Sequence, residues 1–489
     1  MRHLALLLDR DRYEVGALAC FRQEGVTVQA HVLLEAAGVA VDPTPWNLSF
    51  EDTVSHLASV LPVYDVVVAC QDVADVAPAL ERLSLRPALI DFSAENAYGW
   101  GVSEWQRRLA TALVQRPAPA RPTGLFRSFL QGGFECSTHR RAADRQRIDM
   151  IAASHHDLHA EHDYRELARH GIDTVRDGVR WHLIEAAPGH YDWSSLDRQL
   201  AAARATGTEM IWDLLHYGWP DHLDIWSPAF VERFAAFAAA AARHIGPAAP
   251  GERRFYAPVN EISFFAWGGG DVAYMNPFAR GRGFELKVQL ARASIAAMDA
   301  ILTVDPAARF IHADPVINIV ADPATPEDVA DAFGHRHAQF QAWDMIAGRA
   351  WPQIGGRADL LDIVGVNFYH NNQWMHRGET LPLGHLLARP FRDMLAETYA
   401  RYGCPIFVAE TGIEGDARPA WLRMILKEVD AAIAMGVPVE GVCLYPILDH
   451  PGWDDGRYCP NGLLTHGPTR EERRADARLA EAIAEARRR

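Results

Sequence analysis

The chain has 489 residues, of which 49% are hydrophobic and 23% are charged, and its formal net charge at pH 7 is −15. This length exceeds what one hydrophobic core usually serves, so two domains are expected. The negative charge argues against nucleic acid or an anionic membrane as a main partner, because both attract basic surfaces. No apolar run reaches the roughly 18 residues that a membrane-spanning helix needs.

The first residues, MRHLALLLDRDRYE, contain a short apolar run that becomes charged at once and shows no small-residue cleavage site. They predict a first strand and not a secretion signal. The 6 cysteines are scattered and form no C-x-x-C pair. We therefore expect a cytoplasmic protein with free thiols.

Residues 1–114 contain the apolar runs HLALLLD, DVVVAC and PALIDF, which alternate with stretches suited to helices. This alternation predicts a small Rossmann-like α/β domain with a parallel sheet. No G-x-G-x-x-G motif and no P-loop occurs, so nothing supports nucleotide binding. The role of the domain stays open between structure or partner docking and ligand recognition. Residues 115–124, QRPAPARPTG, are rich in proline and predict a linker.

Residues 125–489 carry eight candidate strands, each followed by enough chain for a helix. Ser227 and Pro228 suit the start of one of these helices, and Gly436 suits the end of another. Such a repeat predicts a (β/α)₈ TIM barrel. In chain order the strands are FLQGGFEC, TVRDGVRW, EMIWDLLH, RFYAPVNE, ARFIHAD, LDIVGVNFY, PIFVAET and EGVCLYPIL.

Polar residues gather at the carboxyl ends of these strands, which is where barrel enzymes carry their chemistry. Two of them are glutamates, Glu261 at the end of the fourth strand and Glu410 at the end of the seventh. The others are His139, Arg176, Arg180, His216, Asn260, His312, Asp314, Asn367, Tyr369 and Asp449.

Strands four and seven lie on roughly opposite sides of a barrel mouth, so Glu261 and Glu410 can face each other. Two carboxyls about 5 to 5.5 Å apart serve as nucleophile and acid/base in retaining glycoside hydrolysis. One carboxyl must hold a proton while the other stays ionised, and Arg176 would favour the ionised form of the nucleophile. A structural salt bridge at Glu261, or a buried ion pair at Arg176 or Arg180, is the alternative.

Seven motifs between about Phe129 and Leu464 resemble glycoside hydrolase family 1, the β-glucosidase-like members of a wider clan of retaining barrel glycosidases. The resemblance implies Glu261 as acid/base and Glu410 as nucleophile, and the Asn-Glu order of Asn260 and Glu261 is part of it. The motifs are FLQGGFECSTH, VRDGVRWHLIEAAPGHYDW, LLHYGWPDHL, PVNEI, VGVNFYH, AETG and YPILDHPGWDDGRYCPNGLL.

The resemblance also assigns roles around the two carboxyls. It implies Arg176 as the active-site arginine, Asn260 as the partner of the sugar 2-hydroxyl, and Tyr369 as a neighbour of the nucleophile. His216, Asn367 and Trp453 would contact the sugar. Arg180 and Asp449 at strand ends, and His139 and Tyr445 at substituted family positions, complete the expected substrate-binding set.

Five positions depart from the family pattern. The family's proline after the acid/base is Ile262, and the asparagine after the nucleophile is Thr411. Three further changes fall on residues that read the sugar, so we expect the chemistry to be kept and the glycone specificity to be altered. These are His139 for a glutamine, Gly452 for a glutamate and Tyr445 for a tryptophan.

Four stretches have compositions that could suggest a metal or phosphate site, but we expect no such site in any of them. The stretch SHHDLHAEHD places His155 and His159 on one helix face, but away from the catalytic end and without an H-E-x-x-H order, so a solvated or capping role is expected. The stretches GHRHAQF, WGGGD and WDDGRY are expected to be helix surface or loop.

The sequence thus predicts a retaining β-glycoside hydrolase that cleaves O-glycosidic bonds by double displacement, through a glycosyl-enzyme intermediate and without a cofactor. Its partner would be a carbohydrate or glycoside, and the oligomeric state is left open. A transglycosidase on the same site, a catalytically silent carbohydrate-binding protein, and an N-terminal transferase with an accessory barrel are the alternatives.

Overall fold

The structure is a computed structural model that describes residues 121, 124–249, 252–322, 325–382, 384–385 and 387–488, together with six strands nearer the N-terminus. Most of the predicted linker, residues 115–124, and any helices of residues 1–114 lie outside the described residues. The division into residues 1–114, 115–124 and 125–489 therefore stays a prediction.

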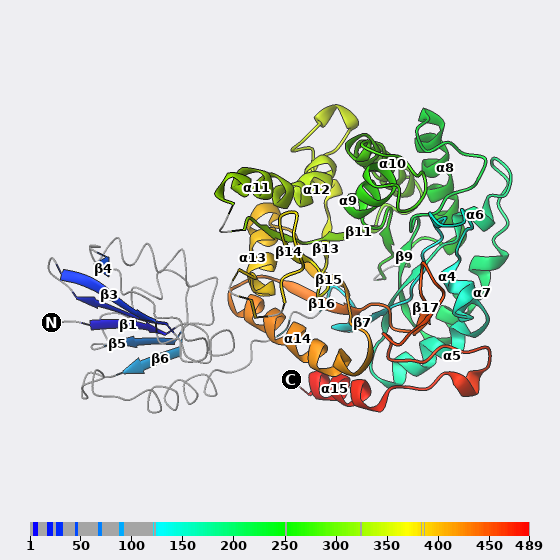
Figure 1. Ribbon diagram of the computed structural model, residues 1–489. Helices are drawn as coiled ribbons and strands as arrows, with labels where there is room; N and C mark the ends of the chain where they lie inside the picture. The colour runs from blue at the N-terminus through cyan, green and yellow to red at the C-terminus, as the bar shows by residue number, and fades with distance from the viewer. Residues whose placement is uncertain are drawn as a thin grey trace. The chain divides into compact units, whose positions relative to one another are not determined.

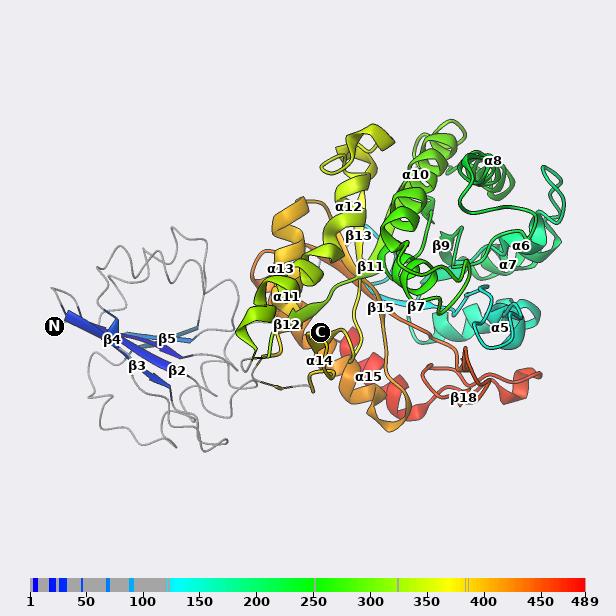
Figure 2. The same ribbon diagram turned by 45° about the horizontal axis from the view of Figure 1, so that its top comes forward.

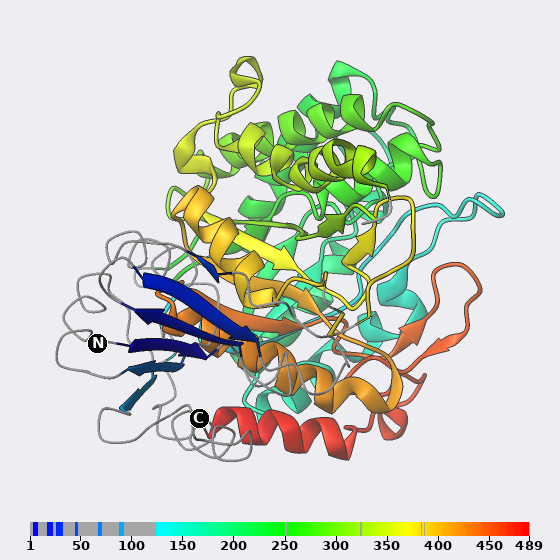
Figure 3. The same cartoon turned by 60° about the vertical axis from the view of Figure 1, so that its left-hand side comes forward.

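The six N-terminal strands form one sheet in the order β4-β3-β2-β1-β5-β6 (Figure 3). The runs HLALLLD, DVVVAC and PALIDF supply β1, β5 and β6, as predicted. The parallel, Rossmann-like sheet is wrong for these strands, since only β5 and β6 pair in parallel. Residues 23–25 alone join β2 to β3, and so short a connection permits only antiparallel pairing. The strands are β1 (His3–Leu7), β2 (Ala17–Arg22), β3 (Val26–Val32), β4 (Pro45–Trp46), β5 (Val67–Cys70) and β6 (Ala88–Asp91).

The rest of the described chain is built on a closed barrel of eight parallel strands (Figure 1). Each of the eight candidate segments coincides with or overlaps one barrel strand, so the predicted (β/α)₈ barrel is confirmed. In sequence order the strands are β7 (Leu130–Gly133), β8 (Thr174–Gly178), β9 (Glu209–Asp213), β10 (Phe255–Ala257), β11 (Arg309–Pro315), β13 (Ile363–Asn367), β15 (Ile406–Thr411) and β16 (Val439–Leu444).

Helices lie outside these strands (Figure 2). Pro228 opens one of them after Ser227, as predicted, and Gly436 follows another with φ 88°. The longer helices are α5 (His156–Arg169), α7 (Ser194–Thr206), α8 (Pro228–Ile245), α10 (Gly283–Leu302), α11 (Val329–His337), α13 (Phe391–Tyr402), α14 (Arg418–Ala434) and α15 (Ala477–Arg487). None in the described residues is long and apolar enough to cross a membrane.

Short elements shape the connections between barrel strands. The short helices are α4 (Met150–Ala153), α6 (Trp181–Ile184), α9 (Ile262–Phe265), η3 (Ala266–Asp271), η4 (Pro326–Asp328), η5 (Ala338–Phe340), α12 (Gln341–Ile346), η6 (Pro352–Ile354), η7 (Ala358–Leu360), η8 (Gly415–Ala417) and η9 (Arg470–Glu472). Two small sheets pair β12 (Asn318–Val320) with β14 (Gln373–Met375), and β17 (His450–Pro451) with β18 (Tyr458–Cys459).

An apolar core fills the inside of the barrel. Phe126, which precedes the first barrel strand, places its ring 4.9 Å from that of Phe255 and 5.1 Å from that of Phe407. Side chains of β9, β11, β13 and β16 complete this cluster. Because apolar side chains occupy the interior, polar groups are left to the carboxyl ends of the strands.

Candidate active site

A cavity of about 1490 Å³ opens at the carboxyl ends of the barrel strands. Its lining includes six of the residues that the sequence singled out. Five of them lie at or just past the end of a barrel strand, and Trp453 lies in the closing loop between β17 and β18. These residues are His216, Glu261, Tyr369, Glu410, Tyr445 and Trp453.

Two donors orient Glu410 and favour its ionised form. The guanidinium of Arg176 donates from Nη1 to Glu410 Oε1 at 2.8 Å, and the hydroxyl of Tyr369 donates to Oε2 at 3.0 Å. Arg176 lies on β8 with 0% of its surface exposed, while Glu410 lies on β15 and is 4% exposed. Both oxygens of Glu410 are thus oriented by groups that favour a carboxylate.

Asp213 balances the buried guanidinium from the other side. Its two oxygens accept from Arg176 Nε at 3.0 Å and Nη2 at 2.8 Å, in a two-pronged pair. Asp213 was not among the residues predicted from the sequence, although an acid at the end of β9 beside an arginine on β8 was the available signal. Burial of Arg176 is possible because Asp213 and Glu410 share its charge.

Glu261 occupies a different environment. Tyr217 donates its hydroxyl to Glu261 Oε2, and Asn367 Nδ2 donates to Oε1 at 2.8 Å. Within the described residues, no Lys, Arg or His side chain forms an ion pair with it. The residue has φ 44°, a left-handed conformation that turns the chain sharply from β10 into α9 (Ile262–Phe265). Glu261 therefore has hydrogen bonds and no cation.

The two carboxyls share a raised affinity for protons. Burial raises the pKa of Glu261 to about 7, although its hydrogen bonds from Tyr217 and Asn367 oppose this. Burial and the charge of Glu261 raise the pKa of Glu410 to about 7, and Arg176 opposes that rise. Because each negative charge disfavours the other, the pair keeps a proton near neutral pH. The ion pair with Arg176 favours Glu410 as the ionised partner and leaves the proton on Glu261.

Asn260 connects the arginine to the histidine of the site. Its Oδ1 accepts from Arg176 Nη2, so its Nδ2 is the atom that donates to His216 Nε2 at 3.0 Å and to the Tyr217 hydroxyl at 3.0 Å. His216 Nε2 is then an acceptor, and Nδ1 carries the proton that Asp213 Oδ2 accepts at 3.0 Å. One orientation of the amide thus fixes the tautomer of His216.

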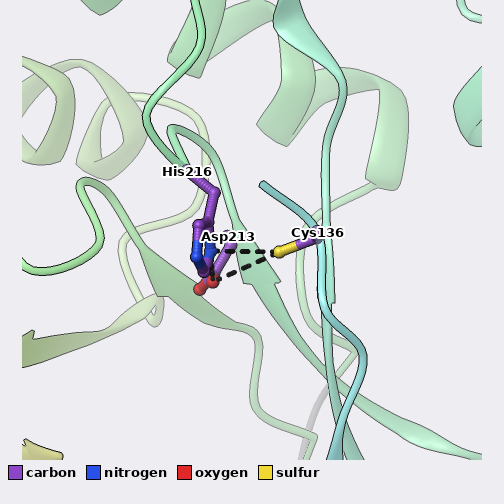
Figure 4. Close-up of side chains that lie close together, drawn as sticks. All are labelled: Cys136, Asp213 and His216. Carbon is purple, nitrogen blue, oxygen red and sulfur yellow. Dashed lines mark hydrogen bonds and ion pairs between the residues drawn. The ribbon is translucent and has the colours of Figure 1, made fainter. Parts of the chain in front are cut away.

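Cys136 closes a compact cluster behind His216 (Figure 4). Its Sγ lies 3.1 Å from His216 Nδ1 and 3.7 Å from Asp213 Oδ2, close enough for the three atoms to hold a metal ion. Burial, however, raises the pKa of the Cys136 thiol well above its ordinary value, and Arg176 already neutralises Asp213. A protonated thiol and a neutralised aspartate are poor ligands for a metal ion. We therefore interpret the three residues as a hydrogen-bonded cluster that positions the imidazole of His216.

Five predicted substrate contacts lie outside the cavity lining, His139, Arg180, Asp449, Asn260 and Asn367. His139 is buried, with its ring 4.6 Å from the ring of Trp453 in an edge contact. Arg180 pairs with Asp149 at 3.2 Å. Asp449 accepts from the Tyr458 hydroxyl at 2.7 Å and from the Gly462 amide at 2.7 Å, which fixes the closing loop. Asn367 contacts Glu261, and Asn260 contacts Arg176, His216 and Tyr217.

The aromatic residues near the cavity have distinct contacts. The Tyr445 ring lies parallel to that of His216 at 6.1 Å, with the Arg176 guanidinium 5.3 Å from its centre. Trp453 lines the cavity, while Trp267 does so with 50% of its surface exposed. Trp181 packs against α8 as core.

One discounted histidine has an unexpected role. His156 was expected to be solvated or to cap a helix, but it is 0% exposed and lies between Asp163 at 2.7 Å and Asp177 at 2.9 Å. Burial lowers its pKa, but the two aspartates outweigh this and raise the pKa to about 9. The histidine is a structural cation behind the barrel, and the helical spacing of the sequence gave no sign of its acid partners.

The sequence analysis missed two residues of the inner cavity, Glu135 and Tyr217. Tyr217 has φ 66°, so it breaks the alternation that a strand would impose and turns its ring inward. The next residue, Gly218, has no room for a side chain, because an added Cβ would lie 2.3 Å from the carbonyl oxygen of Thr138. Such close backbone packing leaves no pattern that strand periodicity can detect.

Comparisons with known proteins confirm the resemblance at the level of the fold. A family 1 β-glucosidase from Thermotoga maritima superposes with a TM-score of 0.60 at 15% identity, covering 76% of this chain and 99% of its own. A Thermotoga maritima β-glucosidase in complex with glucoimidazole gives 0.59 at 15% identity, over 75% and 99% of the two chains. The AHE enzyme from Alicyclobacillus herbarius gives 0.61 at 17% identity, over 75% and 99%.

Likeness in sequence is more local. The chain is 36% identical over 75 residues to a β-galactosidase from Sulfolobus acidocaldarius, which is 15% of this chain and spans only 15% of that relative's length. No protein-family model matches the chain. The comparisons therefore establish a barrel of the family 1 β-glucosidase fold.

Proposed function

We propose that the chain is a glycosidase, a retaining β-glycoside hydrolase that acts through a glycosyl-enzyme intermediate. The observation that carries this proposal is the contrast between two glutamates in one cavity. Both carboxyls have a pKa raised to about 7, but Glu410 is paired with Arg176 at 2.8 Å, while Glu261 has hydrogen-bond donors and no cationic partner among the described residues. The fold shared with β-glucosidases, one of them in complex with glucoimidazole, supports a carbohydrate substrate.

In the first half of the reaction, a Glu410 oxygen attacks the anomeric carbon while the bond to the leaving oxygen breaks. Glu261 gives its proton to that oxygen, so the aglycone leaves as a neutral alcohol. Arg176 and Tyr369 hold the attacking carboxylate in place. They also keep it unprotonated, which attack requires.

In the second half, Glu261 is ionised and accepts a proton from water as the water oxygen attacks the anomeric carbon. The ester bond to Glu410 breaks, and both glutamates return to their starting state. Two inversions at one carbon give net retention. An alcohol in place of water would make the same site a transglycosidase, and the exposed Trp267 at the cavity offers a surface for such an acceptor.

The test compares the wild type with Glu410→Ala on a panel of aryl β-glycosides. We expect the variant to lose turnover by several orders of magnitude while it stays folded, because the nucleophile is absent. Azide should partly restore aryl release and yield the glycosyl azide of inverted configuration. Activity that survives the substitution would refute Glu410 as nucleophile, and sugar binding by an inactive wild type would favour the silent carbohydrate-binding protein.

A further inference from the structure

A third carboxylate, which the proposed mechanism does not use, lines the same cavity. Glu135 follows the first barrel strand and is 8% exposed. Its Oε1 accepts hydrogen bonds from the amide of Ser137 at 2.9 Å and from the Ser137 hydroxyl. Throughout the described ranges, no hydrogen bond or ion pair is formed by Oε2. One oxygen is thus anchored by the protein and the other is free.

Glu135 is ionised at neutral pH. Burial raises its pKa, but the imidazoles of His216 and His450 and the hydrogen bonds from Ser137 lower the pKa, and the lowering prevails. An ionised carboxylate can only accept hydrogen bonds. A buried carboxylate with one unpaired oxygen is therefore stabilised only if the molecule that fills the cavity supplies a hydrogen-bond donor.

Within the described residues, no Lys, Arg or His side chain forms an ion pair or a hydrogen bond with Glu135. Arg176 is shared between Asp213 and Glu410, with both pairs at 2.8 Å. Burial lowers the pKa of His139 to about 4, so this imidazole is neutral at pH 7. Oε2 of Glu135 is consequently left to a donor on the ligand.

The cations farther out in the cavity lining have other partners. Arg457 pairs with Glu414 at 2.6 Å, and Arg377 pairs with Asp328 at 3.0 Å. Lys287 Nζ donates to Gln341 Oε1 at 3.0 Å. An anionic ligand would therefore meet Glu135 with Arg457 and Arg377 already paired to carboxylates, whereas a ligand rich in donors would satisfy Glu135.

We propose that Glu135 selects which glycone binds. Its free oxygen accepts a hydrogen bond from a hydroxyl or ammonium substituent of the sugar. Its negative charge excludes glycones that carry carboxylate or phosphate. This inference rests on the proposed hydrolase and names the substrate class of that site. Like charges confined in a cavity of low dielectric repel strongly, so exclusion needs no steric barrier.

The test uses four aryl β-glycosides: the glucoside, the 2-amino-2-deoxyglucoside, the glucuronide and the 6-phosphoglucoside. We expect wild-type kcat/KM for the better of the first two to exceed that for either anionic substrate by about 100-fold or more. Glu135→Gln should lower that better value by about 10- to 100-fold and narrow the gap to the glucuronide at least about tenfold. Glu161→Gln, the same change at an exposed pair with Arg165 on α5, is the matched control.

Comparing the aminoglucoside with the glucoside shows whether the sugar donates to Glu135 through an ammonium group or through a hydroxyl group. A larger loss for the aminoglucoside than for the glucoside in Glu135→Gln indicates an ammonium ligand, and an equal loss indicates a hydroxyl. A wild type that prefers an anionic glycoside overturns the inference, as does a folded Glu135→Gln that keeps all four kcat/KM ratios. If Glu135→Gln does not fold, Glu135→Asp, which keeps the charge and withdraws it by one methylene, should lower activity and keep the exclusion of anions.

Failure of the hydrolase proposal would be seen separately. If the wild type turns over none of the four glycosides, binding of the matching methyl β-glycosides is measured by tryptophan fluorescence, since Trp453 lines the cavity. Tighter binding of the neutral or amino sugar that is lost in Glu135→Gln would uphold the inference without the activity. Absence of selective binding by the folded wild type would overturn it.

Discussion

Tyr217 donates its phenolic hydrogen bond to Glu261 Oε2, so the group assigned as acid/base is held by a residue on the neighbouring strand end. The hydroxyl also accepts from Asn260 at 3.0 Å, which leaves its own proton directed at the carboxyl. A donor stabilises the ionised form of Glu261, and the bond therefore opposes the effect of burial on its pKa.

Removing that donor should move the pH profile. In Tyr217→Phe the pKa of Glu261 rises further, so the acid keeps its proton to higher pH. We expect the alkaline limb of the kcat/KM profile, set near pH 7 in the wild type, to shift upward by about 0.5 to 1 pH unit. Stopped assays of aryl glycoside hydrolysis across pH measure this, and a shift to lower pH would contradict the assigned hydrogen bond.

Glu261 should make the protein less stable as the pH rises. Its pKa is about 7 when folded against an ordinary 4.5, so its contribution is fully present below the unfolded value and is lost as the pH rises through the folded one. In Glu261→Gln this loss is absent. We expect the variant to gain about 1 to 3 kcal/mol relative to the wild type between pH 5 and pH 8. Urea unfolding at both pH values gives the difference, and a constant difference would count against the raised pKa.

His156 should also stabilise the fold at low pH, but its contribution is lost over a higher pH window than that of Glu261. Its pKa is raised from 6.5 to about 9, so its stabilisation is complete below pH 6.5 and is lost as the pH rises through 9. His156→Ala leaves Asp163 and Asp177 buried with less compensation, and we expect a loss of about 3 to 5 kcal/mol at pH 6. Denaturant unfolding at pH 6 and pH 10 should show a much smaller loss at the higher pH.

Trp267 should act on the aglycone and not on the chemistry. It lines the cavity with 50% of its surface exposed, and its ring lies 5.7 Å from that of Phe264. In Trp267→Ala we expect KM for an aryl glycoside to rise by about 5- to 30-fold with little change in kcat, because a stacking surface worth about 1 to 2 kcal/mol is lost. Leu183→Ala, a change at another exposed apolar residue, should leave both constants unchanged.

Strand periodicity was enough to predict the barrel and the positions of Glu261 and Glu410, because a residue at a strand end has its place fixed by the closed sheet. It was not enough for Tyr217 or Glu135, which lie in the turns that follow β9 and β7. Their direction depends on a left-handed residue in one case and on the Ser137 hydrogen bonds in the other. Neither the left-handed backbone nor the hydrogen bonds can be inferred from an alternation of polar and apolar residues.

The N-terminal sheet shows the complementary error. Apolar runs identified β1, β5 and β6 but could not give their direction, since pairing depends on the connections between strands. His139 and Asp449 show a third limit. Both follow barrel strands as expected, yet one packs on Trp453 and the other fixes the closing loop. Position after a strand brings a residue to the mouth without deciding which way its side chain turns.

The contacts of Arg176 join four barrel strands or their ends: β8, which carries it, β9 through Asp213, β10 through Asn260, and β15 through Glu410. The guanidinium of Arg176 therefore links these strands across the mouth of the barrel. Opening a seam next to it would separate opposite charges in a place that water does not reach. The proposed catalysis and the stability of the closed barrel consequently depend on the same contacts of Arg176. A substitution that weakens these contacts is expected to alter both.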